Sequence, residues 1–238
     1  MSSTNKPVLK IDWATHEAAK FACMNWHYSK SIPVGKIVKV GAWENNKFIG
    51  VVMFAWGANN HLGSPYGLPM VECCELVRIA LTAHQTPVSK IMAISIRWLK
   101  KQSSGLRLIV SYADTSQGHH GGIYQATNWI YCGFINQAST AEYKGKVAHK
   151  RTFDAAGIKG YTLQPAKPKH KYLMPLDAAM REQIAHLAKP YPKRVKQAMT
   201  GLQPEQRRSD TDPPAPFTSN VISSEQTGNP FISLKKAA

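Results

Sequence analysis

The stretch ELVRIALTAHQTPVSKIMAISIRWLKKQSSGLRLIVSYAD, residues 75–114, decides the fold class of this chain. Its first and last segments, residues 75–81 and 106–112, are short apolar runs rich in β-branched and aliphatic side chains, which indicates buried strands. Between them, residues 88–101 carry apolar side chains at helical spacing and end in two lysines that suit the negative end of a helix. The stretch therefore predicts a strand–helix–strand crossover at the centre of a sheet.

The segments on the N-terminal side extend this sheet. Residues 12–28 predict a helix, capped by Asp12 or Thr15, that ends in an aromatic and polar cluster. Two β-rich runs, residues 37–43 and 48–54, flank an Asn-rich break and predict a hairpin. A loop rich in glycine and proline follows.

On the C-terminal side we expect a short helix over residues 123–129 and two later strands, in residues 140–152 and 170–175. The complete order predicts an α/β (α+β) fold with a mixed central sheet flanked by helices. We expect a main domain over residues 1–158, a basic extension with the last strand and helix over 159–208, and a disordered tail, rich in Ser, Thr, Pro, Asn and Gln, over 209–238.

The charge of the chain indicates a polyanionic partner. It carries 30 Lys and Arg against 14 Asp and Glu, a net charge of +16. Nucleic acid is the first expected partner, because no long basic amphipathic helix suggests a membrane surface. No apolar run is long enough to span a bilayer and residues 1–10 do not resemble a secretory signal, so we expect a cytoplasmic protein. The four cysteines lack a CxxC spacing, which argues against a zinc ribbon and for reduced thiols.

The segment SYADTSQGHHGGIYQA, residues 111–126, contains the densest set of reactive side chains. Asp114 ends a buried strand, the position where α/β sheets place ligands. Gly121 and Gly122 precede a helix and allow backbone N–H groups to approach an anion. Tyr124, in the first turn of that helix, is close enough to share a site with Asp114. The plain alternatives are a helix cap for Asp114 and core packing for Tyr124.

Two further groups of residues are candidates for chemistry. His27, between Trp26 and Tyr28, is a candidate general base because the ordinary pKa of histidine lies near neutrality. Glu75 begins an apolar strand, where a buried carboxyl needs a function or a partner such as Arg78. The adjacent His119 and His120 lack the spacing of metal ligands, and we expect them to contact phosphate or solvent.

The order of elements resembles the GNAT acyltransferase superfamily. Residues 75–81, 88–101 and 106–113, followed by Tyr124 and the Gly133-Phe134 pair, look like the central series of that fold. The resemblance implies that Tyr124 protonates the leaving group. The basic, Gly-rich loop that binds the pyrophosphate of coenzyme A in the superfamily is replaced here by TAHQTP, residues 82–87. This departure counts against ordinary coenzyme A binding.

Longer motifs are similar to the Mom family of phage DNA-modification proteins. They are WHYS (26–29), GSPYG (63–67), CELVR (74–78), AD (113–114), QGHHGGIYQA (117–126), YLMPLD (172–177) and KPYPKRVK (189–196). The resemblance runs from about residue 21 to residue 196. It implies an enzyme in the host cytoplasm that converts the exocyclic amine of adenine in double-stranded DNA to a carbamoylmethyl (acetamido) derivative and thereby protects phage DNA from restriction.

The residue chemistry and the resemblance together suggest roles for the candidate residues. The catalytic residues would be Asp114, Tyr124, His27 and Tyr28. The adenine would contact Trp26, Tyr66, Glu75, Arg78 and Ser111. The donor would contact Gly121, Gly122, His119 and His120. The DNA backbone would contact Lys189, Lys193, Arg194 and Lys196.

The donor would be acetyl-CoA or an aminoacyl-tRNA of the glycyl type. Because simple acyl transfer does not form an N–CH2 linkage, an extra step, an unusual donor or a redox metal such as iron is needed.

Two other functions remain open at this point. A non-catalytic nucleic-acid-binding protein would need the basic segment but not the pairing of Asp114 with Tyr124. An ordinary GNAT N-acetyltransferase would bind coenzyme A tightly and release an acetylated product.

Overall fold

The computed structural model describes residues 6–56, 61–135, 140–165 and 168–192. Ten strands form two sheets in this part of the chain. The bounds of the strands are β1 Leu9–Trp13, β2 Ile37–Glu44, β3 Lys47–Ala55, β4 Cys73–Leu81, β5 Leu108–Asp114, β6 Ile130–Ile135, β7 Thr140–Tyr143, β8 Lys146–His149, β9 Thr162–Leu163 and β10 Lys169–Pro175. The helices are α1 His16–Trp26, α2 Val88–Gln102, α3 Gly122–Gln125, α4 Lys150–Ala155 and α5 Ala178–Gln183, with short 3-10 turns at Ser64–Tyr66, Met70–Glu72, Thr115–Gln117 and Ala185–Leu187.

The large sheet has seven strands in the order β1-β2-β3-β4-β5-β10-β6. Neighbours are antiparallel except β4 and β5, which are parallel and joined through α2. This is the crossover that residues 75–114 predict. The expected α/β class, a mixed sheet flanked by helices, is confirmed.

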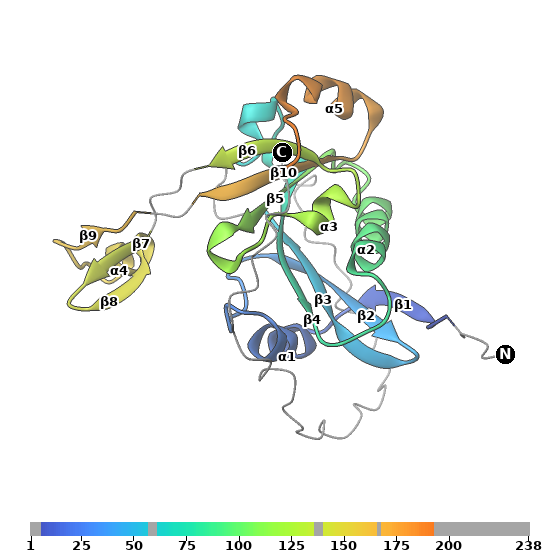
Figure 1. Ribbon diagram of the computed structural model, residues 1–238, viewed down its shortest axis with the longest axis horizontal. Helices are drawn as coiled ribbons and strands as arrows, with labels where there is room; N and C mark the ends of the chain where they lie inside the picture. Colours follow the sequence, from blue (N-terminus) through green and yellow to red (C-terminus); the bar gives the residue numbers. More distant parts are fainter. Residues whose placement is uncertain (1–5, 57–60, 136–139, 166–167, 193–238) are drawn as a thin grey trace, which may run out of the picture.

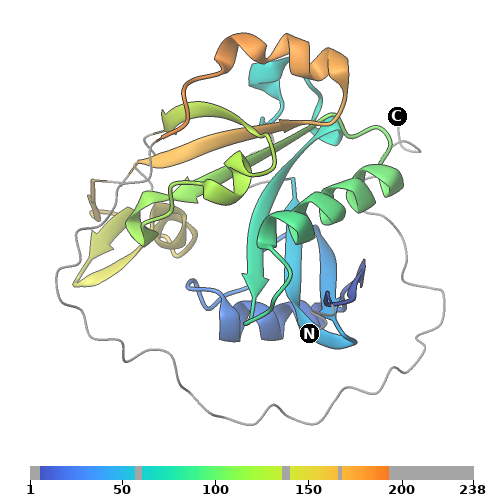
Figure 2. The same ribbon diagram turned by 45° about the vertical axis from the view of Figure 1, so that its right-hand side comes forward.

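Helices cover both faces of the large sheet. The main core lies between the sheet and helices α2 and α3, and it includes Ile91, Met92 and Leu99 from α2. On the opposite face α1 packs on β3 and β4, whereas α5 packs on β5 and β10. Figure 1 shows α1 and α5 at opposite ends of the sheet, and Figure 2 shows α2 along one face.

The small sheet, β8-β7-β9, interrupts the connection between β6 and β10. Together with α4 it projects to one side of the large sheet (Figure 1). The sequence analysis expected one strand in residues 140–152. That expectation is wrong, because Lys144 and Gly145 both adopt positive φ and turn the chain back on itself, so β7 and β8 form a hairpin. Helix α4 then begins at Lys150.

Two other local expectations need correction. Residues 9–13 form the edge strand β1, which pairs with β2, although no strand was predicted before the first helix. The helix itself begins at His16. Thr15 rather than Asp12 caps it, because the Thr15 hydroxyl accepts a hydrogen bond from the Ala18 N–H. The helix expected over residues 123–129 ends at Gln125, because Asn128 adopts φ +59° and the Trp129 N–H returns to the Tyr124 carbonyl. The pair Gly133-Phe134 belongs to β6.

The strand β10 lies inside the large sheet, between β5 and β6. The sequence analysis placed it in a basic extension after residue 158. The domain boundaries stay a prediction, but this strand contributes Tyr172 and Leu173, both fully buried, to the core of the main fold. The expected tail, residues 209–238, lies outside the described residues.

Candidate active site

A fork in the large sheet creates a cavity in the described part of the molecule. The parallel pairing of β4 with β5 covers only residues 73–76 and 108–111. Beyond this point β4 pairs with β3 alone and β5 pairs with β10 alone, so the two strands diverge (Figure 2). A cavity of about 690 Å³ opens between them, and the segments that line it belong to the end of α1, β4, the start of α2, β5 and α3. Diverging strands of this kind are where open α/β sheets bind ligands.

A chain of hydrogen bonds closes the base of the fork. The Ser111 hydroxyl donates to the Leu76 carbonyl at 2.9 Å and lies 2.8 Å from the Tyr124 hydroxyl. Because the single proton of Ser111 is used on the carbonyl, the Tyr124 O–H donates to Ser111. Burial raises the pKa of Tyr124 to about 12, so the phenol keeps its proton near neutral pH. Ser111 is 1% exposed and therefore positions Tyr124 rather than contacting a substrate directly.

His27 lies at the end of α1 and is held in one tautomer. Its Nδ1 accepts a hydrogen bond from the Ser29 N–H at 3.1 Å, so the neutral ring carries its proton on Nε2. Burial, followed by the charges of Arg78, His119 and Lys30, lowers the pKa of His27 to about 4. The imidazole is therefore neutral at physiological pH and suited to donating a hydrogen bond from Nε2. This geometry favours a donor over the general base that the sequence suggested.

Tyr28 contacts both His27, at the end of α1, and His119, in the segment after β5. Its ring lies 4.2 Å from that of His27 and 5.8 Å from that of His119, measured between centroids. Burial and then the charge of Asp114 raise the pKa of Tyr28. Its side chain remains 48% exposed, which leaves an aromatic surface at the mouth of the cavity.

Asp114 is the single carboxylate among the described residues that line this cavity. It ends β5 opposite Lys169 of β10, and its Oδ2 lies 3.9 Å from the Lys169 Nζ. The cavity thus places a carboxylate, a protonated phenol and a neutral imidazole around one space. That set can accept a proton, donate a proton and donate a hydrogen bond.

Arg78 reaches the cavity because β4 is irregular. The register with β3 shifts between Leu76 and Arg78, which leaves Val77 as an extra residue and re-aims the side chains that follow. Within the described part of the chain Arg78 forms no ion pair, and its buried Nε has no hydrogen-bond partner. Arg78 is therefore a cation available to a carbonyl or an anionic group.

The wall after β5 depends on Tyr172 of β10. The Tyr172 hydroxyl donates to the His120 carbonyl at 2.6 Å, and its ring stacks on Tyr124 with centroids 4.8 Å apart. Gly121 adopts φ +81°, and a Cβ there would lie 2.3 Å from the Tyr172 ring. Gly121 and Gly122 are therefore explained by the close approach of this ring and of His120, and α3 is a single turn. Donor binding by the glycine pair stays a prediction.

In the wall after β4, a carboxylate of the chain itself binds the backbone amides of the loop. Glu44, at the end of β2, accepts hydrogen bonds from the Gln85 N–H (2.9 Å), the Thr86 N–H (2.7 Å) and the Thr86 hydroxyl (2.6 Å). The Glu44 side chain is buried, and these hydrogen bonds, that of the Thr86 hydroxyl first, lower its pKa. The resemblance to GNAT acyltransferases predicts that loop 82–87 occupies the position of a pyrophosphate-binding loop. Two amides of this loop already donate to Glu44 and are not available to an anion. The loop therefore does not fit a pyrophosphate.

Three of the expected site residues lie elsewhere. Tyr66 packs on the opposite face of the sheet, beneath the Lys171 ammonium, 5.0 Å from its ring centroid. Glu75 alternates along β4 to the same face as Cys73, and neither Tyr66 nor Glu75 lines the cavity. Burial raises the pKa of Glu75 to about 7. Lys189 lies at the outer edge of β6, whereas Lys193, Arg194 and Lys196 fall outside the described residues.

The structure can be compared with the expectations about a membrane span and a metal site. Across the described ranges, no helix is long and apolar enough to cross a bilayer. Nor do three His, Cys, Asp or Glu side chains gather there as metal ligands would, so these residues do not fit iron. Sequence reasoning missed Glu44 and Tyr172 as supports of the site. Tyr172 belongs to the quoted motif YLMPLD, but nothing in the local sequence of Glu44 indicates its partners.

The model of the Mom protein family matches residues 8–193 of this chain. Similar solved structures include an N-acetyltransferase from Staphylococcus aureus, with 12% identity and a TM-score of 0.45 over 71% of this chain and 98% of that chain. An acetyltransferase of the GNAT family from Streptococcus pneumoniae has 12% identity and a TM-score of 0.44 over 71% of this chain and 100% of that chain. A Bacillus subtilis acetyltransferase in complex with CoA has 15% identity and a TM-score of 0.41 over 72% of this chain and 100% of that chain. No curated protein matches the sequence significantly.

Proposed function

Because this chain belongs to the Mom protein family, we propose that it is a transferase that modifies the N6 amine of adenine in double-stranded DNA, with N6-carbamoylmethyladenine as the final product. The observation that carries the proposal is the fork cavity, where Asp114, Tyr124 and His27 surround one space. The net charge of +16 supports a nucleic-acid substrate.

The substrate base has to leave the duplex before it can react. Extrusion of a base costs a few kcal/mol, and enzymes recover this cost by stacking and hydrogen bonding in a closed site. The exposed ring of Tyr28 offers a stacking surface at the mouth, and Trp26 lines the same cavity. The His27 Nε2–H and the Arg78 guanidinium are donors for acceptor atoms of the base or of the donor group.

The proton transfers follow from the protonation states of the site. The lone pair of adenine N6 is delocalised, so attack on an acyl carbon requires removal of the N6 proton as the new N–C bond forms. Asp114 accepts that proton, since it is the carboxylate that lines the cavity. Tyr124 supplies a proton to the leaving group when its O–H turns from Ser111 toward the cavity, and the contact with Ser111 holds the phenol in place until then.

The donor that balances the product is a glycyl ester, as in an aminoacyl-tRNA. A glycyl group contains the carbonyl, the methylene and the nitrogen of a carbamoylmethyl group, so glycyl transfer breaks the ester C–O bond, releases the ribose hydroxyl and gives an isomer of the product. Conversion of the isomer to the product needs no oxidant or further reactant: the glycyl amine bonds to C6 of adenine, and the original C6–N6 bond breaks to leave that nitrogen in the carboxamide. An acetyl group lacks the nitrogen. The occupation of loop 82–87 by Glu44 also favours a donor that does not place a pyrophosphate there.

The test is mass spectrometry of nucleosides from plasmid DNA after expression of the chain in a bacterium. We expect a deoxyadenosine heavier by a carbamoylmethyl group, identified by co-elution with the synthetic compound and separated from its glycyl isomer. An acetyl-sized increase would instead indicate an ordinary acetyltransferase that uses acetyl-CoA. Unmodified adenine in the presence of folded, abundant protein would favour a non-catalytic nucleic-acid-binding protein.

A further inference from the structure

A second cavity lies on the outer edge of β6, away from the fork. It has a volume of about 460 Å³ and is lined by Asn128, Trp129, Ile130, Tyr131, Arg181, Ala188, Lys189 and Tyr191. Two of these residues are cations, and none is a carboxylate. Among the residues that the structure describes, neither Arg181 nor Lys189 forms an ion pair. The cavity therefore presents uncompensated positive charge.

The segment that forms this cavity is fixed against the sheet. The Lys189 N–H donates to the Tyr131 carbonyl at 2.8 Å, and the Tyr191 hydroxyl donates to the Trp129 carbonyl at 2.7 Å. The Lys189 side chain lies over Gly133, where a Cβ would come within 3.1 Å of its Cδ. These contacts fix the backbone at Lys189 and the side chain of Tyr191 before any ligand arrives, which lowers the entropic cost of binding.

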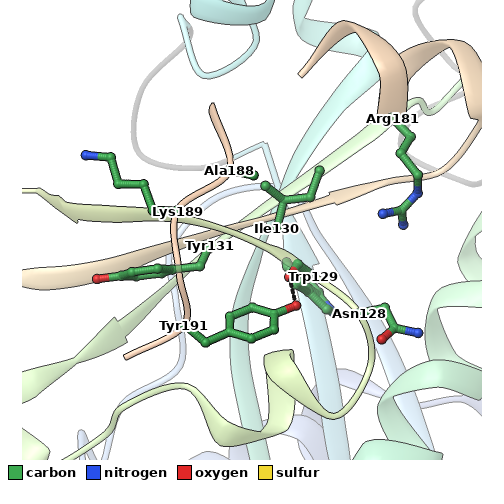
Figure 3. A pocket seen from close by; sticks show the side chains of 8 residues that line it. All are labelled: Asn128, Trp129, Ile130, Tyr131, Arg181, Ala188, Lys189 and Tyr191. Carbon is green, nitrogen blue, oxygen red and sulfur yellow. Dashed lines mark hydrogen bonds between the residues drawn. The ribbon is translucent and has the colours of Figure 1, made fainter. Parts of the chain in front are cut away.

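The arrangement combines charge with an aromatic surface. Figure 3 shows Lys189 and Arg181 on opposite sides of the Trp129–Tyr191 pair. The ring of Tyr191 is 45% exposed although its hydroxyl is bound. Cations that flank an exposed aromatic ring are the pattern by which proteins hold a nucleic-acid strand, with phosphates on the cations and a base or sugar on the ring.

We propose that the cavity at the β6 edge binds a nucleic-acid strand, with Arg181 and Lys189 contacting phosphates and Tyr191 contacting a base or sugar. The inference rests on the proposed function, in which the chain acts on DNA with an aminoacyl-tRNA donor. Duplex DNA and tRNA share this chemistry. The cavity is separate from the fork, so its contribution is affinity and not chemistry.

The test compares binding of the full chain to a fluorescent duplex and to tRNA across a series of salt concentrations, without any donor. The double variant Arg181→Gln, Lys189→Gln should lower the slope of log K against log salt by about two for the nucleic acid that uses the site, since each phosphate contact contributes roughly one. Lys47→Gln, an exposed cation at the start of β3, is the matched control and should leave the slope nearly unchanged.

A second variant measures the contribution of the Tyr191 ring to nucleic-acid binding. Tyr191→Leu should weaken binding about tenfold without changing the salt slope, because stacking releases no counterions. Tyr191→Phe, which keeps the ring, should bind more tightly than Tyr191→Leu. An effect on the duplex alone assigns the site to DNA, and an effect on tRNA alone assigns it to tRNA. Unchanged slopes for both, in variants with wild-type melting curves, would overturn the proposal. Since this assay measures no modification, its outcome is independent of whether adenine is the substrate.

Discussion

The two strands that form the fork lead into walls of different character. After β4, the amides of Gln85 and Thr86 are occupied by Glu44, a carboxylate of the chain itself. After β5, the chain makes a single-turn helix, and Asp114, His119 and Tyr124 line the cavity. The comparison indicates that the amides of the β4 wall serve the fold, whereas the β5 wall presents side chains that under the proposed function carry out the proton transfers. Each wall can be tested separately.

Asp114→Asn should produce the largest effect. The amide keeps the shape of the side chain but cannot accept the N6 proton, so we expect modification in cells to fall at least roughly a hundredfold. The affinity for duplex DNA should stay within about twofold, because one partly buried carboxylate contributes little to binding of the DNA phosphates. Nucleoside mass spectrometry and a binding titration check the two quantities. Full modification by this variant would remove Asp114 from the mechanism.

Gly121→Ala should break the β5 wall structurally. The new Cβ would meet the Tyr172 ring and require a left-handed backbone, a combined cost on the order of 2–4 kcal/mol in the free energy of unfolding. Gly118→Ala is the matched control, because Gly118 adopts φ +68° but has no atom near a Cβ, so its cost should be about 1–2 kcal/mol. Urea denaturation measures both. Equal losses would show that contact with Tyr172 is unimportant.

Glu44→Gln should loosen the β4 wall with less effect on chemistry. The amide cannot accept all three hydrogen bonds, so we expect the midpoint of thermal unfolding to fall by several degrees at pH 7. The pKa of Glu44 is lowered by folding, so its contribution is present above the ordinary carboxyl pKa and is lost as the pH falls through the folded value. The difference from wild type should therefore shrink in acid. A large loss of modification in protein that stays folded would instead place loop 82–87 in the reaction.

Glu75 should show the opposite and smaller dependence on pH. Burial raises its pKa to about 7, so its contribution is complete below pH 4.5 and is lost as the pH rises through 7. Glu75→Gln, which stays neutral, should match the wild type in acid and exceed its stability at pH 8.5 by on the order of 1–2 kcal/mol. Urea titrations at both pH values measure this. A variant that is less stable than the wild type at pH 8.5 would contradict the conclusion that burial outweighs the charges of Lys169 and Arg78 at Glu75.

Local patterns were sufficient for much of the fold and part of the site. The crossover over residues 75–114 and the hairpin of β2 and β3 follow from apolar periodicity, and both are present. The segment over residues 111–126 correctly brought Asp114 together with Tyr124. Periodicity did not reveal β1 or the hairpin of β7 and β8, because these strands are short and depend on pairing with a neighbour.

The sequence by itself determined the family, the mixed α/β class and the placement of Asp114 and Tyr124 at one cavity, since each depends on residues close together in the chain. Only the tertiary structure decided that Tyr172 shapes the β5 wall, that Glu44 closes the β4 wall and that Arg181 joins Lys189 at the β6 edge. It also decided that Tyr66 lies on the other face. These contacts join residues tens of positions apart, and they depend on strand order, on register and on the shift at Val77, none of which is encoded in the periodicity of a single segment.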